Sequence, residues 1–307
     1  MKSFNQLAKI GALVTVLVAF SACQKDRVSS TNIEGDELAT SAFKSDNNDP
    51  KGLTFYALRG GTVLDKYSTT NPENVLSTTT ITGLNGATIL GIDFRPSNSM
   101  LYGLGSDDKI YLIDPATGVA VAGPELFSNG TAMPPSEANM TRTPVSVDGP
   151  FVGFDFNPMA DRLRIVSSGT GQSLRINVET GFTIIDGSIN PQPAAITSVA
   201  YDNNDNDPAT ATQLYAIDVL TQKLFEINPP NAGTLVEEGP LRLKVTGEGG
   251  FDIAPRNSAV MSDIGLGLYD VNNKSTLFRI DVESGETKIL AKYKDLSYSG
   301  IAISPAL

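Results

Sequence analysis

The segment Gly153-Phe-Asp-Phe-Asn-Pro158 is the clearest copy of a short motif that recurs along this 307-residue chain. Each copy reads as an apolar strand that opens a structural unit. The other copies are Gly91-Ile-Asp-Phe-Arg-Pro96, Ser198-Val-Ala-Tyr-Asp-Asn203, Gly250-Phe-Asp-Ile-Ala-Pro255 and Gly300-Ile-Ala-Ile-Ser-Pro305. Successive copies begin 62, 45, 52 and 50 residues apart, which is the period of propeller blades or solenoid turns.

Within a unit, a second and a third strand follow the first, and the third ends in an Asp or Asn that begins a tight turn. An acceptor side chain at that position can bond the backbone amide two residues on, and the closing glycine supplies a positive φ. The turns are Asp114-Pro-Ala-Thr-Gly118, Asn177-Val-Glu-Thr-Gly181, Asn228-Pro-Pro-Asn-Ala-Gly233 and Asp281-Val-Glu-Ser-Gly285. The mature chain has no convincing helical periodicity, so the predicted fold class is all-β.

The two ends of the repeat region complement each other. Residues 54–58 resemble the second strand of a unit and have no opening strand before them, whereas the copy at 300–305 is an opening strand with almost nothing after it. Pairing these two segments in one sheet closes the array into a ring and removes its exposed edges. We therefore predict a five-bladed β-propeller, closed by its N- and C-terminal strands, over residues 53–307.

The segment Gly153-Phe-Asp-Phe-Asn-Pro-Met-Ala-Asp-Arg-Leu-Arg164 resembles a bacterial family known as domain of unknown function 4394. Residues 214–218 and 228–235 carry the same likeness, which covers most of residues 53–305. The resemblance implies a secreted or anchored, β-propeller-like protein. It implies no activity, because the family has none to transfer.

Residues 1–22 have the organisation of an export signal. Two lysines precede an apolar run over residues 10–20, which is too short to span a bilayer. Small residues precede Cys23, as in bacterial lipoproteins, so we expect Cys23 to be lipidated. Residues 23–52 are polar and serve as a flexible tether. The prediction is an outer-membrane lipoprotein that faces the periplasm or the cell surface.

Composition removes several classes of function. The chain has no histidine, which excludes Ser-His-Asp hydrolysis and histidine-ligated zinc or copper. Without residues 1–22, 21 basic side chains remain against 34 acidic ones, a net charge of −13. This charge disfavours nucleic acid and anionic lipid as partners. We expect a protein or small-molecule partner, with membrane contact through the lipid anchor alone.

Asp93, Asp155 and Asp252 occupy the same position in three copies of the opening strand, where the other copies have alanine. In a propeller the opening strand is innermost, so these acids could converge near the channel and bind a cation or act as acid and base. The alternative is structural, since a side chain repeated from blade to blade usually bonds the backbone of the next blade.

A second group of candidates is the charge cluster of Asp161, Arg162, Arg164 and Arg175. Arg164 and Arg175 should lie on neighbouring strands, where two guanidinium groups could grip a carboxylate or phosphate. The alternative is that Asp161 pairs with one of these arginines on a solvated face.

The run of oxygen-bearing side chains over residues 202–207 includes Asp202, Asp205 and Asp207. Such ligands suit Ca²⁺, the only cofactor that the sequence suggests, although the run lacks the glycine and distal Glu of an EF-hand loop. A solvated loop between strands is the alternative. The insertion over residues 127–149 fits either a binding loop or disorder.

These observations favour an extracytoplasmic, lipid-anchored binding or scaffold module over an enzyme. The competing hypothesis is a carboxylate-dependent or metal-assisted hydrolase or lyase with its site at the channel mouth. That hypothesis requires the three acids of the opening strands to reach solvent, so it loses support where they are buried against backbone amides.

Overall fold

A computed structural model describes residues 52–129, 142–204, 209–255 and 265–305 of the chain. Its strands form five four-stranded antiparallel sheets and one two-stranded ribbon. We name the five sheets the closing, second, third, fourth and fifth blades, in order along the chain. Apart from strands, these residues form one short 3₁₀ helix, η1 (Pro230–Ala232). The all-β prediction is therefore confirmed.

In four blades the strands run outward in sequence order from the innermost strand, and in the closing blade the last strand of the chain is innermost. The closing blade contains β22 (Gly300–Ile303), β1 (Thr54–Arg59), β2 (Val63–Ser68) and β3 (Ser77–Thr80). The second blade contains β4 (Ile89–Arg95), β5 (Met100–Gly105), β6 (Lys109–Ile113) and β7 (Ala120–Glu125). The third blade contains β10 (Val152–Asn157), β11 (Arg162–Ser167), β12 (Ser173–Ile176) and β13 (Thr183–Ile185).

The last two blades follow the same order. The fourth blade contains β14 (Ile196–Tyr201), β15 (Leu214–Asp218), β16 (Lys223–Ile227) and β17 (Leu235–Pro240). The fifth blade contains β18 (Val245–Ile253), β19 (Gly265–Val271), β20 (Lys274–Ile280) and β21 (Thr287–Tyr293). The ribbon of β8 (Phe127–Ser128) and β9 (Thr143–Pro144) belongs to the insertion between the second and third blades.

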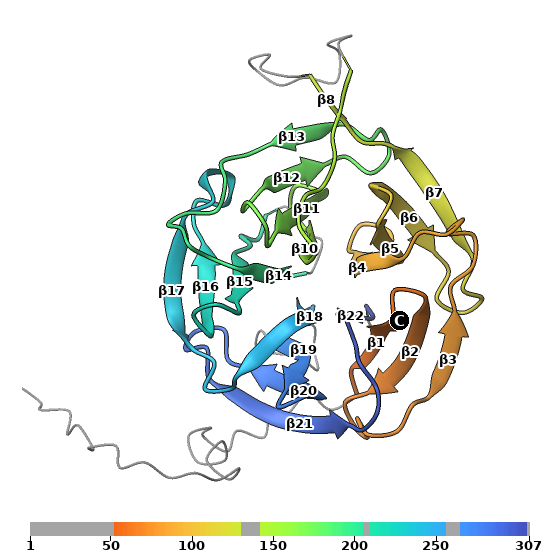
Figure 1. Cartoon of the computed structure of the whole chain (residues 1–307), viewed down its shortest axis with the longest axis vertical. Helices are drawn as coiled ribbons and strands as arrows, with labels where there is room; N and C mark the ends of the chain where they lie inside the picture. The colour runs from red at the N-terminus through yellow and green to blue at the C-terminus, as the bar shows by residue number, and fades with distance from the viewer. Residues whose placement is uncertain (1–51, 130–141, 205–208, 256–264, 306–307) are drawn as a thin grey trace, which may run out of the picture. The chain divides into compact units, whose positions relative to one another are not determined.

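The five blades form a ring around a central channel (Figure 1). Each innermost strand contacts the innermost strand of the next blade, in the order β4, β10, β14, β18, β22 and back to β4. The five-bladed propeller predicted from the repeat is therefore confirmed, and each opening motif lies on the channel wall.

The closing blade joins the two ends of the propeller. Strand β22 pairs antiparallel with β1, with Phe55 opposite Ile303 and Leu58 opposite Gly300. A buried side-chain network strengthens this junction: the hydroxyl groups of Tyr67 and Tyr298 lie 2.7 Å apart, and the Tyr298 hydroxyl donates to Asp65 Oδ2 at 3.0 Å. Residues more than 230 positions apart are thereby held in one sheet.

The core lies between the blades. In β1, Phe55 and Ala57 pack in a cluster with side chains of the fifth blade, whereas Tyr56 and Leu58 pack in a cluster with side chains of the second blade. Successive side chains of a strand point to opposite faces of its sheet, and in a ring both faces are covered. This is why the inner strands are nearly continuous in apolar and small residues.

Three of the four repeated turns bond as their sequence predicts, and the turn that begins at Asn228 does not, because Pro230 has no amide hydrogen to donate. Asp114 Oδ1 accepts from the amide of Ala116 at 2.9 Å, and the equivalent Asn177 Oδ1 accepts from the amide of Glu179 at 3.1 Å. The closing glycine has a second role. A Cβ atom on Gly181, whose φ is 78°, would lie 2.1 Å from the carbonyl oxygen of Glu125. The glycines of three of the four turns thus lie against the outer strand of the preceding blade, and Gly233 lies against the segment just beyond β13.

Candidate functional site

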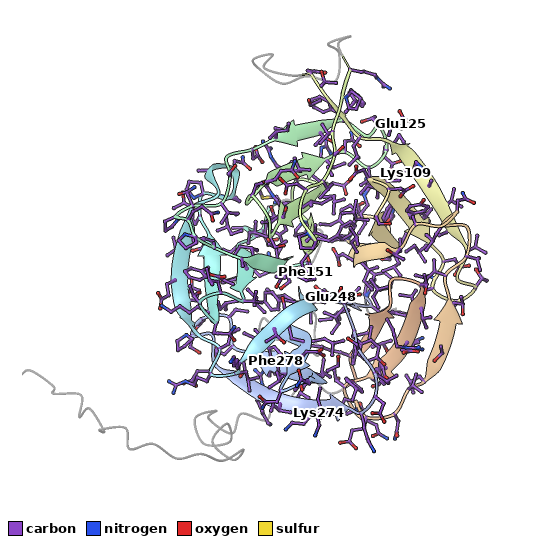
Figure 2. The ribbon with its side chains drawn as sticks, viewed as in Figure 1. Lys109, Glu125, Phe151, Glu248, Lys274 and Phe278 are labelled. Carbon is purple, nitrogen blue, oxygen red and sulfur yellow. The ribbon has the colours of Figure 1, made fainter. Side chains whose placement is uncertain are left out.

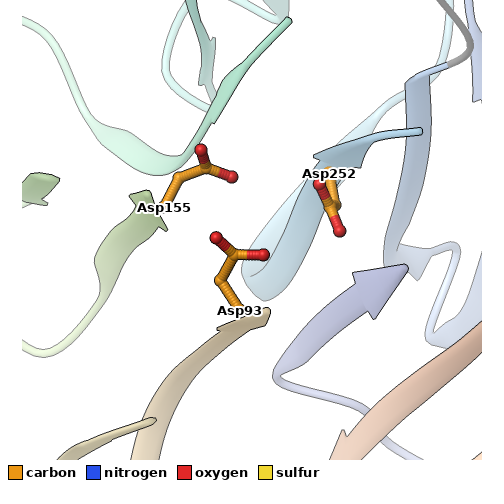
Figure 3. Close-up of side chains that lie close together, drawn as sticks. All are labelled: Asp93, Asp155 and Asp252. Carbon is orange, nitrogen blue, oxygen red and sulfur yellow. The ribbon is translucent and has the colours of Figure 1, made fainter. Parts of the chain in front are cut away.

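The three aspartates of the opening strands meet in the channel, where we call them the hub acids. Asp93, Asp155 and Asp252 project from β4, β10 and β18, and one carboxylate oxygen of each lies within 4.8 Å of one oxygen of each of the others (Figure 3). All three residues are buried, with at most 4% of their surface exposed. The predicted convergence near the channel is confirmed.

Each hub acid accepts a backbone hydrogen bond from the innermost strand of the next blade. The bonds are Phe156 N to Asp93 Oδ2 at 2.9 Å, Tyr201 N to Asp155 Oδ1 at 3.0 Å and Ile303 N to Asp252 Oδ2 at 2.5 Å. The donor always lies one residue beyond the motif position that the aspartate occupies in its own blade. Each hub acid therefore bonds the backbone of the next blade, which is the structural role that the sequence analysis gave as the alternative to ligand binding or catalysis.

Burial and mutual repulsion keep the hub acids from ionising freely. Burial raises the pKa of Asp93 and Asp155 well above the ordinary range, and the charges of neighbouring hub acids raise them further. Burial also raises the pKa of Asp252 to about 7, against the opposing effect of the amides of Ile303 and Ile253. Like charges this close cannot all ionise in a desolvated site, so the hub retains protons at neutral pH unless a cation replaces them.

The space beside the hub acids is small. A cavity of about 20 Å³, lined by Asp93, Asp252 and Asn204 among others, lies at this end of the channel. That volume holds about one water molecule or a single ion, not an organic substrate. The hydrolase or lyase hypothesis required acids that reach a substrate, so the burial and bonding of the hub acids count against it.

The two arginines predicted to lie side by side do so, but both bond the same internal carboxylate. Arg164 and Arg175 are cross-strand partners on β11 and β12. Arg164, which is 1% exposed, donates to Asp186 Oδ2 at 2.7 Å and to Asn231 Oδ1 of the fourth blade at 2.9 Å. Arg175 donates to both carboxylate oxygens of Asp186, at 2.6 and 2.9 Å. This cluster links the third and fourth blades and leaves no guanidinium pair open to an external anion.

Asp161 pairs with an arginine that the sequence did not suggest. Its carboxylate accepts two hydrogen bonds from Arg95 of the second blade, at 2.8 and 2.7 Å, and Arg95 also contacts Glu179. These charge-assisted bonds lower the pKa of Asp161 and raise that of Arg95. Arg162 Nη1 donates to the backbone oxygen of Asp161 at 2.9 Å. The ion pair therefore joins neighbouring blades.

The predicted calcium run is described only in part. Asp202 is buried, and its Oδ1 accepts from the amide of Gln213 at 2.5 Å, which fixes the start of the loop. Asp205 and Asp207 lie outside the described residues. The calcium hypothesis for this run therefore stays a prediction.

A larger cavity opens at the other end of the channel, where the innermost strands begin. It has a volume of about 240 Å³ and we call it the mouth. Figure 2 labels two of its residues, Phe151 and Glu248, which approach the centre of the ring from different blades. The complete lining is Gly60, Gly61, Thr88, Ile89, Leu90, Pro150, Phe151, Val152, Thr197, Glu248, Gly249 and Ser299. The sequence analysis did not single out this site.

Three β-bulges build the mouth. The pairing register of an innermost strand with its neighbour shifts between Ile89 and Gly91, between Ile196 and Ser198, and between Thr246 and Gly249. The residues skipped by the ladder include Leu90, Thr197 and Glu248, and all three line the mouth. A bulge turns a side chain out of its expected direction. The local sequence gives a weak signal in Glu248-Gly-Gly250, where flexible residues follow an acid at a strand start.

The polar side chains of the mouth differ in whether they already have hydrogen-bond partners. Thr197 is 1% exposed, and its hydroxyl lies 2.9 Å from the hydroxyl of Tyr269, whose pKa burial raises to about 12. The Glu248 side chain is exposed and has no hydrogen-bond or ion-pair partner within the described residues. Phe151 is half-buried beside them. The mouth therefore offers one uncommitted carboxylate next to an aromatic ring.

Five closed blades around a bonded hub, with a cavity at one mouth, define a five-bladed β-propeller. The model of the family described as "Domain of unknown function (DUF4394)" matches residues 63–302, and the chain belongs to that family. The resemblance noted in the sequence is thereby confirmed. No match is found among curated proteins. No helix of the described residues is both long and apolar enough to cross a membrane.

Two solved structures show the range of similarity. A nidogen/laminin complex is 11% identical with a TM-score of 0.45, over 82% of this chain and 98% of that chain. A protein of unknown function from Bacteroides thetaiotaomicron is 15% identical with a TM-score of 0.45, over 83% of this chain and 62% of that chain. The chain therefore spans less than two thirds of the second structure.

Proposed function

We propose that this protein is an exported, lipid-anchored binding module that takes a small ligand at the mouth of its propeller. The observation that carries the binding site is the set of three bulges whose displaced residues all line one cavity. A bulge sacrifices regular ladder pairing, and bulges are frequent next to binding sites. Three of them directed at one opening are better explained by a ligand than by packing.

The shape of the channel supports binding at this end. Glycines at the motif position, such as Gly153 and Gly250, let neighbouring inner strands approach so closely that a Cβ atom would lie 2.7 and 2.5 Å from a backbone nitrogen. The cavities further along the channel are accordingly about 20 Å³ each, against about 240 Å³ at the mouth. Only the mouth, among these three cavities, has room for an organic molecule.

The cell-envelope location rests on the first 52 residues. An export signal ahead of Cys23, and a polar tether after it, would hold the propeller away from the membrane surface. The acidic net charge is consistent with a partner other than nucleic acid. A scaffold that binds another protein through the same rim is the main alternative within this proposal.

The test is a thermal-shift screen of a small-molecule library against three forms of the protein. Thr88 is exposed and lines the mouth, so Thr88→Trp should fill the cavity without disturbing the core. Val121→Trp adds the same bulk at an exposed position of β7, away from the mouth. Ligands should raise the Tm of the wild type and of Val121→Trp, and not that of Thr88→Trp.

Two results would refute the proposal. One is a set of ligands that shift the Tm of Thr88→Trp as much as that of the wild type, since these would bind elsewhere. The other is that no compound in the library raises the Tm of the wild type, provided that Thr88→Trp and the wild type have the same circular dichroism spectrum.

A further inference from the structure

The charge of the mouth restricts the chemistry of its ligand. Among the lining residues, all in the described part of the chain, Glu248 alone is charged. It lies in the bulge of β18 and has no partner among the described residues. An anionic ligand would meet this carboxylate with no lysine or arginine to balance it, in a protein that is already acidic.

Two of the three hydroxyl groups of the mouth are already engaged. The Thr197 hydroxyl is bonded to Tyr269, and the Ser299 hydroxyl contacts the carbonyl oxygen of Leu58 at 3.5 Å. A ligand bound through these two groups would have to compete with these contacts, and the third hydroxyl group, on the exposed Thr88, is neutral. The Glu248 carboxylate needs no such displacement, because it is uncommitted.

The rest of the wall is suited to a compact apolar group. Phe151 and Leu90 are both half-buried at the mouth, beside Ile89 and Val152. A cavity of about 240 Å³ is smaller than most sites that bind drug-sized molecules. An aromatic ring near a carboxylate favours an organic cation, because both groups attract positive charge.

We propose that the mouth binds a small organic ammonium ion, with its cationic group on Glu248 and its apolar body against Phe151 and Leu90. The inference rests on the proposed function, since it names the ligand class of that same site. It predicts a strict order of preference among ligands that share one body and differ in charge: cation, then neutral molecule, then anion.

The experiment uses three such probes: 2-phenylethylamine, 2-phenylethanol and phenylacetate. Each is titrated into the purified protein near neutral pH and at matched ionic strength, and the dissociation constants are measured by NMR. The amine should bind about fivefold more tightly than the alcohol, as expected of an exposed ion pair. Phenylacetate should bind more weakly than the alcohol.

Two matched variants separate a local contact from a general effect of charge. Glu248→Gln should reduce the affinity for the amine to that for the alcohol and leave the alcohol unchanged. Glu125→Gln removes the same charge from the exposed end of β7, on the outer strand (Figure 2), and should change none of the three constants. Raising the salt concentration should weaken binding of the amine alone.

Several outcomes would overturn the assignment. Phenylacetate binding as tightly as the amine would do so, as would a preference for the amine that survives Glu248→Gln or is lost equally in Glu125→Gln. Failure of all three probes to bind would also overturn it. None of these results decides whether the mouth binds a ligand at all, because the comparison of Thr88→Trp with the wild type tests that separately.

Discussion

Replacing Asp252 by asparagine is expected to stabilise the protein at alkaline pH and to leave it almost unchanged at acidic pH. The asparagine keeps a side-chain oxygen that can accept from the amide of Ile303, which now bonds Asp252 Oδ2 at 2.5 Å. It replaces the other carboxyl oxygen by an NH2 group, so the side chain can no longer ionise. The perturbation therefore isolates the cost of a buried charge among the hub acids.

The magnitude follows from the pKa of Asp252. The ordinary value is 3.8, and burial raises the value in the folded protein to about 7. The folded state therefore holds a proton that the unfolded state has lost between these two values, so stability is fully present below about pH 4 and falls as pH rises to about 7. The difference between the two pKa values corresponds to a loss of about 4 kcal/mol in the free energy of unfolding at about pH 8. Asp252→Asn should restore part or all of that free energy.

The assay is urea unfolding at several values between about pH 5 and about pH 8, followed by far-ultraviolet circular dichroism because the chain has no tryptophan. The free energy of unfolding of Asp252→Asn minus that of the wild type should grow with pH. Asp252→Ala is the control for the hydrogen bond. It leaves the buried amide of Ile303 unpaired, which should cost about 1–3 kcal/mol relative to Asp252→Asn at every pH.

The reasoning would be refuted by a variant that is less stable than the wild type at about pH 8, or by a difference that does not change with pH. A bound cation would produce the first pattern, because it would hold the three carboxylates in their ionised form. Repeating the series with Ca²⁺ and with a chelator distinguishes the two explanations. Only a cation at the hub makes the effect of Asp252→Asn depend on the metal.

Three further predictions concern the ring and its anchor. Tyr298→Phe removes a buried hydroxyl group that joins the chain ends, and should lower the free energy of unfolding by about 1–3 kcal/mol. The control is Tyr215→Phe, which should lower it less, because the Tyr215 hydroxyl contacts a residue close by in the sequence. Gly181→Ala should lower the free energy of unfolding by at least about 2 kcal/mol. Gly86 has a φ of 97° but open space at its Cβ, so Gly86→Ala should lower it by about 1 kcal/mol. Equal losses in the two variants would contradict the argument that Gly181 is needed for the close approach of the preceding blade. Cys23→Ser should move the protein from the membrane fraction to the soluble fraction, and a variant that stays in the membrane would disprove lipidation.

The ring could be predicted because its determinants are repeated. A motif that recurs five times, followed in four units by a polar turn after the third strand, specifies one unit, and neighbouring units differ only in detail. The split between the first and last segments then fixed the closure between β1 and β22. The same repetition explains why the bonding role of Asp155 and its equivalents could be anticipated: one local geometry is used at equivalent positions of three blades.

The partners of the charged residues could not be predicted in the same way. Arg164 and Arg175 share Asp186, which lies just after the next strand, and Asp161 pairs with Arg95 of another blade. The pair of Asp161 with Arg95 depends on how one blade is placed against the next, and Asp186 lies beyond the end of β13, where the alternation of the strand no longer sets the direction of a side chain. The spacing of residues along the chain carries no information on either. Two arginines on neighbouring strands need a carboxylate close by when one of them is buried, but the sequence shows neither the burial nor the partner.

The mouth escaped prediction for a related reason, and this bears on how the fold can serve binding. The bulges at Leu90, Thr197 and Glu248 lie just before the repeated motif, so the extra residues leave the alternation within the motif unchanged and no repeated pattern marks them. Within the motif, the hub acids and close glycines bond one blade to the next, so substitutions there threaten the ring. At the strand starts the same blades tolerate irregularity, because the ladder is already ending. A propeller can therefore vary its ligand at the mouth without altering the hub that holds it together.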